Sequence, residues 1–259
     1  MSRLNFKNIY TAGAVVNESD LYIHYHNPKM LIKYDDNYLE FLKMPTLEQF
    51  KEAAAYLHDF HLQRNQYHVK FKFPENKKPV EELIHYFITC NYDYTYLELF
   101  AIQPNQFPRV QENSDLTIQL VSEVNFDHYL YTKYQQDSAF GKEFANAQRD
   151  AYQQEFQDPS KLQILSYFRG NISGSLDIII GQNIAEIDGL YVLEAYRNKG
   201  IASAMQQFIM NTFPDKTIIV LADGEDTPRE MYIKQKYRYL AFQYEVQKVY
   251  MNQKATIKQ

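Results

Sequence analysis

A strand-like segment that turns within a few residues into an amphipathic helix constrains this chain more than any other feature. Residues 184–193 read as a strand, and the short turn Arg-Asn-Lys-Gly follows at 197–200. Apolar residues then recur at helical spacing, at Ile201, Ala204, Met205, Phe208 and Ile209. A strand that runs through a short turn into a core-packed helix is typical of mixed α/β domains.

The rest of the second half has the same mixture of elements. Strands are expected at 116–122, 161–168, 173–181, 184–193 and 216–223, with a last strand-rich stretch to about 250. Helices are expected at 126–136, at 140–157, from 200 and from 228. This order predicts a mixed α/β fold, with helices on both faces of one mixed sheet.

The first half shows a similar but shorter order. Strand-like runs are expected at 10–16, 20–25, 30–34 and 38–43. Two helices follow: one is opened by Thr46, with Gln49 in the capping-box position, and the other starts at Pro79. The apolar face of the second helix is expected to include Val80, Leu83, Ile84 and Phe87.

The best linker lies at residues 103–115, which hold two prolines, several amides and little periodicity. We therefore expect a smaller N-terminal α/β domain at 1–110 and a second domain at 111–259. The similar order of elements raises the option that the first domain is a diverged copy of the second. No repeat at the level of residues supports that option.

Composition narrows the function classes and the location. The net charge is −5 and no basic block stands out, which disfavours nucleic acid as a partner. No apolar run approaches the roughly 20 residues that span a bilayer, and the first residues lack the apolar core of a signal peptide, so we expect no membrane partner. The single cysteine, Cys90, cannot form an internal disulfide, which fits the cytoplasm. His58, His61 and His68 have no acidic or cysteine partners that would complete a metal site, so we expect no metal.

The start of the helix near residue 200 is the best candidate for a binding site. Residues 197–202 present successive backbone N–H groups at the positive end of a helix dipole, where pyrophosphate binds well. Gly200 and Ala202 are small enough for a phosphate to approach those amides, and Arg197 and Lys199 add positive charge.

The pattern Arg-x-x-Gly-x-Ala at 197–202, after a strand that contains Leu-Tyr-Val at 190–192, resembles the acetyl-CoA-binding signature of the GNAT N-acetyltransferase superfamily. The resemblance covers residues 116–250. It implies acetyl-CoA as co-substrate and an amine as acceptor. It also implies that the coenzyme is held by Leu190, Tyr191, Val192, Arg197, Asn198, Lys199, Gly200, Ile201, Ala202 and Ser203.

The resemblance also suggests two catalytic residues. Tyr232, in Met-Tyr-Ile-Lys-Gln-Lys-Tyr, aligns with the family's Leu-Tyr-Glu-Lys-Leu-Gly-Phe, whose tyrosine protonates the departing thiolate. Glu186 resembles the catalytic glutamate of the histone-acetylating branch. Asp188, on the same strand face, or a water relay could instead take the proton.

Two departures from the family pattern lie around the last helix. Lys236 and Tyr237 replace the usual Gly-Phe after it. In the loop before it, Glu225 and Asp226 stand where an asparagine is frequent.

The expected function is direct transfer of acetyl from acetyl-CoA to an amine. The alternative is a catalytically inactive protein that binds acyl-CoA as a sensor or scaffold. The N-terminal domain has no counterpart of the 197–202 signature, and it could wall the acceptor site or mediate a homodimer. The mildly acidic net charge suits a cationic acceptor, but the sequence does not identify that amine.

Overall fold

The computed structural model describes residues 4–224 and 228–250, which gather into two compact units. The first unit contains the described residues of 1–98, 222–226 and 240–259, and the second contains those of 99–221 and 227–239. The chain therefore leaves the first unit after residue 98, returns to it briefly at 222–226, and returns again from residue 240. The consecutive domains expected at 1–110 and 111–259 stay a prediction, because these units are defined by contacts alone.

The first unit is built on a sheet whose strand order is β1-β2-β3-β4-β11-β5. Its β-strands and α-helices are β1 (Ala14–Glu18), β2 (Tyr22–His26), β3 (Tyr38–Phe41), α1 (Leu47–Leu62), β4 (His68–Lys72), α2 (Glu81–Thr89), β5 (Asp93–Ile102) and β11 (Arg238–Val249). Strands β3 and β4 are parallel, and β4 pairs antiparallel with β11. Strand β5 passes into the second unit after Glu98, and β11 enters the first unit at Leu240.

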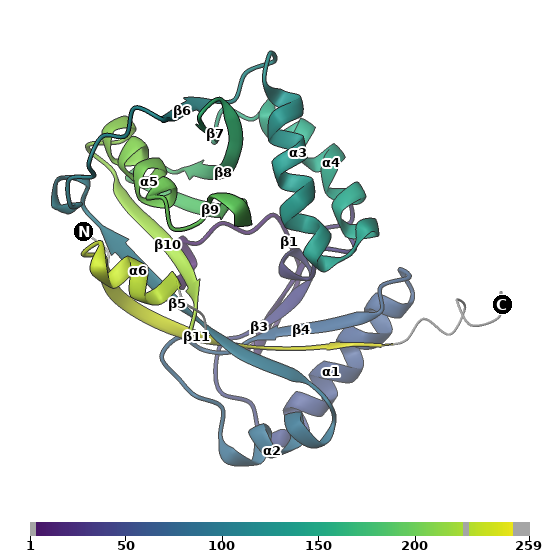
Figure 1. Cartoon of the computed structure of the whole chain (residues 1–259). Helices are drawn as coiled ribbons and strands as arrows, with labels where there is room; N and C mark the ends of the chain where they lie inside the picture. The colour runs from purple at the N-terminus through teal and green to yellow at the C-terminus, as the bar shows by residue number, and fades with distance from the viewer. Residues whose placement is uncertain (1–3, 225–227, 251–259) are drawn as a thin grey trace. The chain divides into compact units, whose positions relative to one another are not determined.

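Aromatic side chains dominate the core of the first unit, between its sheet and helices α1 and α2 (Figure 1). Five fully buried phenylalanines and one leucine belong to this core: Leu39, Phe41, Phe50, Phe71, Phe73 and Phe87. Helix α1 begins with the predicted capping box, in which Thr46 and Gln49 satisfy each other's backbone N–H groups.

Two local expectations for the first unit are wrong. Residues 30–34 form no strand, because the buried Asn37 side chain donates to the carbonyls of Met30 and Lys33 and holds the segment in turns. Val80 is exposed rather than part of the buried face of α2, because it is the N-cap residue and lies outside the helix.

The second unit is a mixed sheet of order β5-β10-β9-β8-β7-β6. Its remaining elements are β6 (Leu116–Leu120), α3 (Phe126–Asp137), α4 (Lys142–Phe156), β7 (Lys161–Phe168), β8 (Asn171–Ile180), β9 (Ile184–Val192), α5 (Ile201–Thr212), β10 (Thr217–Asp223) and α6 (Pro228–Lys234). Helices α3 and α4 lie on one side of strands β7 to β9 and α5 on the other (Figure 1). The predicted mixed α/β fold, with helices on both faces of the sheet, is confirmed.

Short 3-10 helices fill several connections. They are η1 (Phe6–Asn8), η2 (Tyr34–Asp36), η3 (Pro104–Gln106), η4 (Ser138–Phe140) and η5 (Glu194–Tyr196). The last of these, η5, carries the chain from β9 to the turn that opens α5.

Candidate active site

Helix α5 begins without a cap of its own. Its N-cap residue is Gly200, which has no side chain to accept a hydrogen bond, and its first turn holds no acidic residue. The first N–H groups of any helix lack partners within the helix. At α5 these are the N–H groups of Ile201, Ala202 and Ser203, and they mark the positive end of the helix dipole.

The backbone at this turn requires glycine and leaves room beside it. Gly200 has φ of +76°, in the left-handed region that favours glycine, and Asn198 has φ of +61°. A Cβ added at Gly200 would meet nothing within 4 Å. Space that a ligand could fill therefore lies beside Gly200, the N-cap residue of α5.

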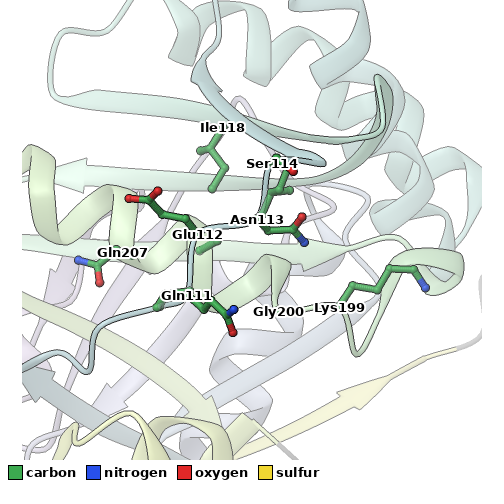
Figure 2. A pocket seen from close by; sticks show the side chains of 11 residues that line it. Gln111, Glu112, Asn113, Ser114, Ile118, Lys199, Gly200 and Gln207 are labelled. Atoms are coloured by element: carbon green, nitrogen blue, oxygen red, sulfur yellow. The ribbon is translucent and has the colours of Figure 1, made fainter.

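A cavity of about 1030 Å³ lies at this helix end (Figure 2). One wall is the extended segment 110–114, and the other is formed by α5 and the turn before it. The lining residues with polar side chains are Gln111, Glu112, Asn113, Ser114, Lys199 and Gln207. The sequence predicted only a linker at 103–115, because an extended wall without periodicity carries no local signal of its role.

Strand β9 separates from its neighbour just before the turn. It pairs in parallel with β10 from Ile184–Thr217 to Ile187–Val220, although β9 continues to Val192 and β10 to Asp223. Backbone groups of β9 beyond residue 187 therefore have an edge that β10 does not pair. Arg197 Nε donates to the carbonyl of Val192 at 3.3 Å, which ties the turn to the end of β9.

On its other side β9 carries a bulge. Ser175 and Asp177 of β8 are opposite Tyr191 and Asp188, so β9 has one extra residue between the two pairs. Gly189 lies in this extra length with φ of +65°, as the glycine of a bulge does. Leu190, Tyr191 and Val192, which the GNAT resemblance predicts to hold the coenzyme, come directly after it.

Comparison with known proteins agrees with this geometry. The family described as "Acetyltransferase (GNAT) family" matches residues 128–232, and a "Domain of unknown function (DUF5613)" matches residues 4–100. A functionally unknown conserved protein from Staphylococcus epidermidis ATCC 12228 is similar over 96% of this chain and 99% of its own, with 30% identity and a TM-score of 0.90. Residues 128–232 of this chain belong to the GNAT acetyltransferase family. The resemblance inferred from residues 197–202 is thus confirmed.

More distant structures share the fold. A GCN5-related N-acetyltransferase from Kribbella flavida has a TM-score of 0.60 and 11% identity, over 91% of this chain and 89% of that one. A tandem GNAT protein from the clavulanic acid biosynthesis pathway has a TM-score of 0.53 and 6% identity, over 82% of this chain and 74% of its own. No curated protein matches the chain. The GNAT-like fold with a preceding α/β domain, in a tandem-like arrangement, therefore has precedent among solved structures.

Tyr232, the tyrosine suggested by the GNAT pattern, is buried on α6. Its ring centre lies 5.9 Å from that of Phe100 and 5.2 Å from that of Tyr237, and 4% of the residue is exposed. Burial raises the pKa of Tyr232, so its hydroxyl keeps its proton at neutral pH. A raised pKa also makes the phenol a weaker acid, so burial does not by itself favour proton donation. Glu225 and Asp226, which the sequence placed before α6, lie outside the described residues.

Glu186 lies on β9 just before the separation from β10. It is buried and opposite Ile179 of β8 and Ile219 of β10. Asp188, two residues on, is exposed and opposite Asp177. Both side chains share one strand face, because the bulge begins only after Asp188. The strand thus carries one buried and one exposed carboxylate next to the point where β9 and β10 separate.

The first turn of α5 is anchored to the residues after α6. Ser203 Oγ accepts a hydrogen bond from Gln235 Nε2 at 3.0 Å, and the Tyr237 hydroxyl donates to Gln206 Oε1 at 2.8 Å. Tyr237, one of the departures from the GNAT pattern, thus helps to hold the helix that carries the amides.

Within residues 4–224 and 228–250, no group of three or more His, Cys, Asp or Glu side chains is arranged to hold a metal ion. In the same part of the chain, no helix has the length and apolar character that crossing a membrane requires.

Proposed function

We propose that this protein is an N-acetyltransferase that moves an acetyl group from acetyl-CoA to an amine by direct attack. The observation that carries the proposal is the uncapped start of α5, whose N-cap residue Gly200 is open and lines a large cavity. A helix end of this kind binds phosphate groups without further machinery.

In this proposal the N–H groups of Gly200, Ile201, Ala202 and Ser203 hold the pyrophosphate of the coenzyme. Arg197 and Lys199 add positive charge at the rim, and Asn198 shapes the turn through its left-handed backbone. Pantetheine runs along the edge of β9 that β10 leaves unpaired, beside Leu190, Tyr191 and Val192. This path brings the thioester to the bulge at Gly189.

The reaction requires removal of a proton from the amine, protonation of the departing sulfur and stabilisation of negative charge on the carbonyl oxygen. The neutral amine attacks the thioester carbonyl carbon, a C–N bond forms and the C–S bond breaks. The amine gives up a proton, and the departing sulfur takes one, so that the products are an N-acetylated amine and free coenzyme A. Backbone N–H groups of β9 polarise the carbonyl while negative charge develops on its oxygen.

Glu186 is the proposed proton acceptor, directly or through water, with Asp188 as the exposed alternative. Tyr232 is the proposed donor to the departing sulfur, because its hydroxyl is protonated at neutral pH. An alkylammonium acceptor has a pKa near 10.4, so a nearby base assists its deprotonation at neutral pH.

Isothermal titration with acetyl-CoA and with free coenzyme A tests the proposal. The Gly200→Glu variant should lose binding, because a carboxylate then occupies the phosphate position. Gly170→Glu is a matched control: Gly170 also has a left-handed backbone, with φ of +77°, and its Cβ position is also open, but it lies in the turn between β7 and β8. The control should bind as the wild type does.

Absence of binding in folded wild-type protein contradicts the proposal. Binding by both glycine variants places the coenzyme elsewhere. If coenzyme binds but a screen of small amines, amino acids and peptides gives no acetylated product, the protein is a sensor or scaffold rather than an enzyme. With an acceptor in hand, Tyr232→Phe should lower kcat and leave coenzyme binding unchanged.

A further inference from the structure

A buried ion pair lies beneath the bulge of β9. Lys133 of α3 and Asp177 of β8 are joined by a hydrogen-bonded salt bridge of 2.9 Å between Nζ and Oδ2. The Lys133 side chain is 5% exposed and that of Asp177 is 16% exposed. The Tyr129 hydroxyl donates to the other oxygen, Oδ1 of Asp177, at 3.0 Å, so the carboxylate is held at both oxygens.

The ammonium group of this pair lies where a side chain at Gly189 would be. A Cβ built on Gly189 would lie 3.0 Å from Lys133 Nζ and 3.6 Å from Asp177 Oδ2. A side chain at position 189 would therefore displace the lysine. Two features therefore favour glycine at position 189: its left-handed φ, and the Lys133 ammonium, which leaves no room for a Cβ.

Neighbouring groups hold Lys133 from its other sides. Its Nζ lies 5.0 Å from the centre of the Tyr152 ring, and the Tyr152 hydroxyl donates to Asp137 Oδ2 at 2.7 Å. Three carboxylates act electrostatically on the ammonium, those of Asp177, Asp188 and Asp137. The charge is thus fixed in one place by α3, α4, β8 and β9.

Such an arrangement is poorly explained by stability alone. Replacing a buried ion pair by apolar residues of similar size is often neutral or stabilising, because desolvation of the charges is costly. Burial raises the pKa of Asp177 to about 6 in spite of the adjacent Lys133 ammonium, as expected when desolvation of the carboxylate is costly. What the pair does supply is a rigid charge at a defined point on β9.

We propose that Lys133, held by Asp177, is a positioning residue that fixes the bulge of β9 and thereby aims the backbone N–H groups after Gly189 at the thioester carbonyl. The inference rests on the proposed function, because it assumes that the thioester of acetyl-CoA lies along β9. The ammonium acts through the strand and does not itself touch the reacting atoms.

Infrared spectroscopy of bound acetyl-CoA, labelled with ¹³C at the carbonyl, tests this without knowledge of the acceptor. Hydrogen bonds from β9 should shift the carbonyl band of the bound thioester to lower frequency than in solution. In Lys133→Met the protein should still bind acetyl-CoA with little change in affinity, but most of that shift should be lost. A purely structural role would lower thermal stability and leave the band of bound coenzyme in place.

A second variant guards against failure to fold, since Lys133→Met leaves Asp177 buried without its partner. Lys133→Met with Asp177→Leu removes both charges and keeps the volume, and it should lose the same shift. Lys161→Met is the matched control. It removes the β7 lysine that pairs with Glu155 of α4 in the same unit, and it should keep the wild-type band. Once an acceptor is known, kcat should fall by about 10²-fold in the two Lys133 variants, with KM for acetyl-CoA nearly unchanged.

The outcomes separate the two ideas. A wild-type protein that binds no acetyl-CoA overturns the proposed function, and this inference with it. Binding with the same carbonyl band in the wild type and both Lys133 variants overturns the inference alone. A band that Lys161→Met also shifts would overturn it as well, because the effect would then belong to any lost ion pair.

Discussion

Two helices of this protein follow strands in a similar way and begin in opposite ways. In the first unit, α1 follows β3, and in the GNAT unit α5 follows β9. At α1, Thr46 accepts from the Gln49 N–H and the Gln49 side chain accepts from the Thr46 N–H, while Glu48 adds a negative charge to the first turn. At α5, Gly200 offers no side chain and the first turn has no acid.

The difference shows how one backbone feature serves two purposes. A helix that caps its own amides and neutralises its own dipole is finished as a structural element. A helix that does neither leaves its first amides and the positive end of its dipole available to an anionic ligand. The start of the helix, rather than the general fold, therefore marks which unit is expected to hold the coenzyme.

The two units also bury different titratable groups. This difference leads to the largest effect that we predict, a loss of stability of the first unit in acid. The first unit buries four imidazoles, of His24, His26, His61 and His68, whereas the GNAT unit buries the Lys133–Asp177 pair. Burial lowers the pKa of His24 to about 3, of His61 to about 4 and of His68 to about 3, and it lowers that of His26 too. Nearby positive charge, such as the Arg64 guanidinium near His24, His26 and His61, acts in the same direction.

Acid should therefore loosen the first unit before the second. The unfolded chain takes up protons on these histidines below about pH 6.5, while the folded unit does not, so stability is full above that pH and falls as the pH drops. Each histidine contributes up to about 1.4 kcal/mol per pH unit, so between pH 6.5 and 5 the loss is on the order of several kcal/mol. Amide hydrogen-exchange protection, corrected for intrinsic rates, should fall in β2 to β4 and change little in β7 and β8.

The control for this prediction is His128, an exposed histidine of α3. His128→Gln should leave the pH dependence of both units as it is in the wild type. Equal loss of protection in the two units, or none in the first, would show that the buried imidazoles do not set the acid response.

The contrast between helix starts can be tested by giving α5 what α1 already has. Ala202 is the second residue of α5, as Glu48 is the second residue of α1. Ala202→Glu should leave stability unchanged or raise it by about 0.3–1 kcal/mol through the helix dipole. The same carboxylate should weaken acetyl-CoA binding by about tenfold or more, which is about 1.4 kcal/mol, because it repels the pyrophosphate.

Thermal denaturation and isothermal titration check the two halves of this prediction. Thr46→Ala is the reverse experiment, since it should cost about 1 kcal/mol of stability by removing the cap of α1 and leave coenzyme affinity intact. Ala202→Glu protein that binds acetyl-CoA as tightly as the wild type would show that phosphate does not bind at this helix end.

The smallest predicted effect is a change in the free energy of unfolding that depends on the residues at the C-terminal ends of helices. In the first unit, α1 and α2 end with Asn65 and Asn91 in the left-handed conformation, and in the GNAT unit α6 ends with Lys236, at φ of +67°. All three endings have the same backbone bond, from the residue after the left-handed one to the carbonyl five residues before it. Asparagine tolerates this conformation better than lysine does.

Lys236→Asn should therefore raise the free energy of unfolding by about 0.5 kcal/mol, as measured by urea titration. The reciprocal change Asn91→Lys should lower it by a similar amount. A gain in both variants, or in neither, would mean that contacts of these side chains outweigh the backbone preference.

Much of the GNAT unit could be predicted because its signals are local. The strands and helices between residues 116 and 234 fall close to their predicted bounds, since alternation and helical spacing are properties of neighbouring residues. The same holds for the Thr46 capping box. In the first unit, by contrast, residues 30–34 needed the Asn37 side chain to be held in turns, and no pattern within the segment shows that.

The parts of the site that sequence could not predict depend on contacts between distant segments. Residues 110–114 line the cavity only because the chain passes beside α5 there. Lys133 and Asp177 lie in a helix and a strand, where a polar residue is usually read as solvent-exposed, and only packing of α3 on β8 brings them together. The signal in hindsight is Gly189, a glycine inside a strand, which often marks a bulge or a close approach of another group.

The return of β11 to the first unit bears on how the protein is made. Glu245 to Val249 of β11 pair with Lys72 to His68 of β4, so that sheet gains one of its inner strands from a segment that is synthesised after the second unit. Until then, β4 emerges with one edge unpaired, a state that invites pairing with other chains or protection by a chaperone. A gene fragment that encodes only the N-terminal region would leave β4 with that unpaired edge. The first unit can therefore be completed only after the GNAT unit has been translated.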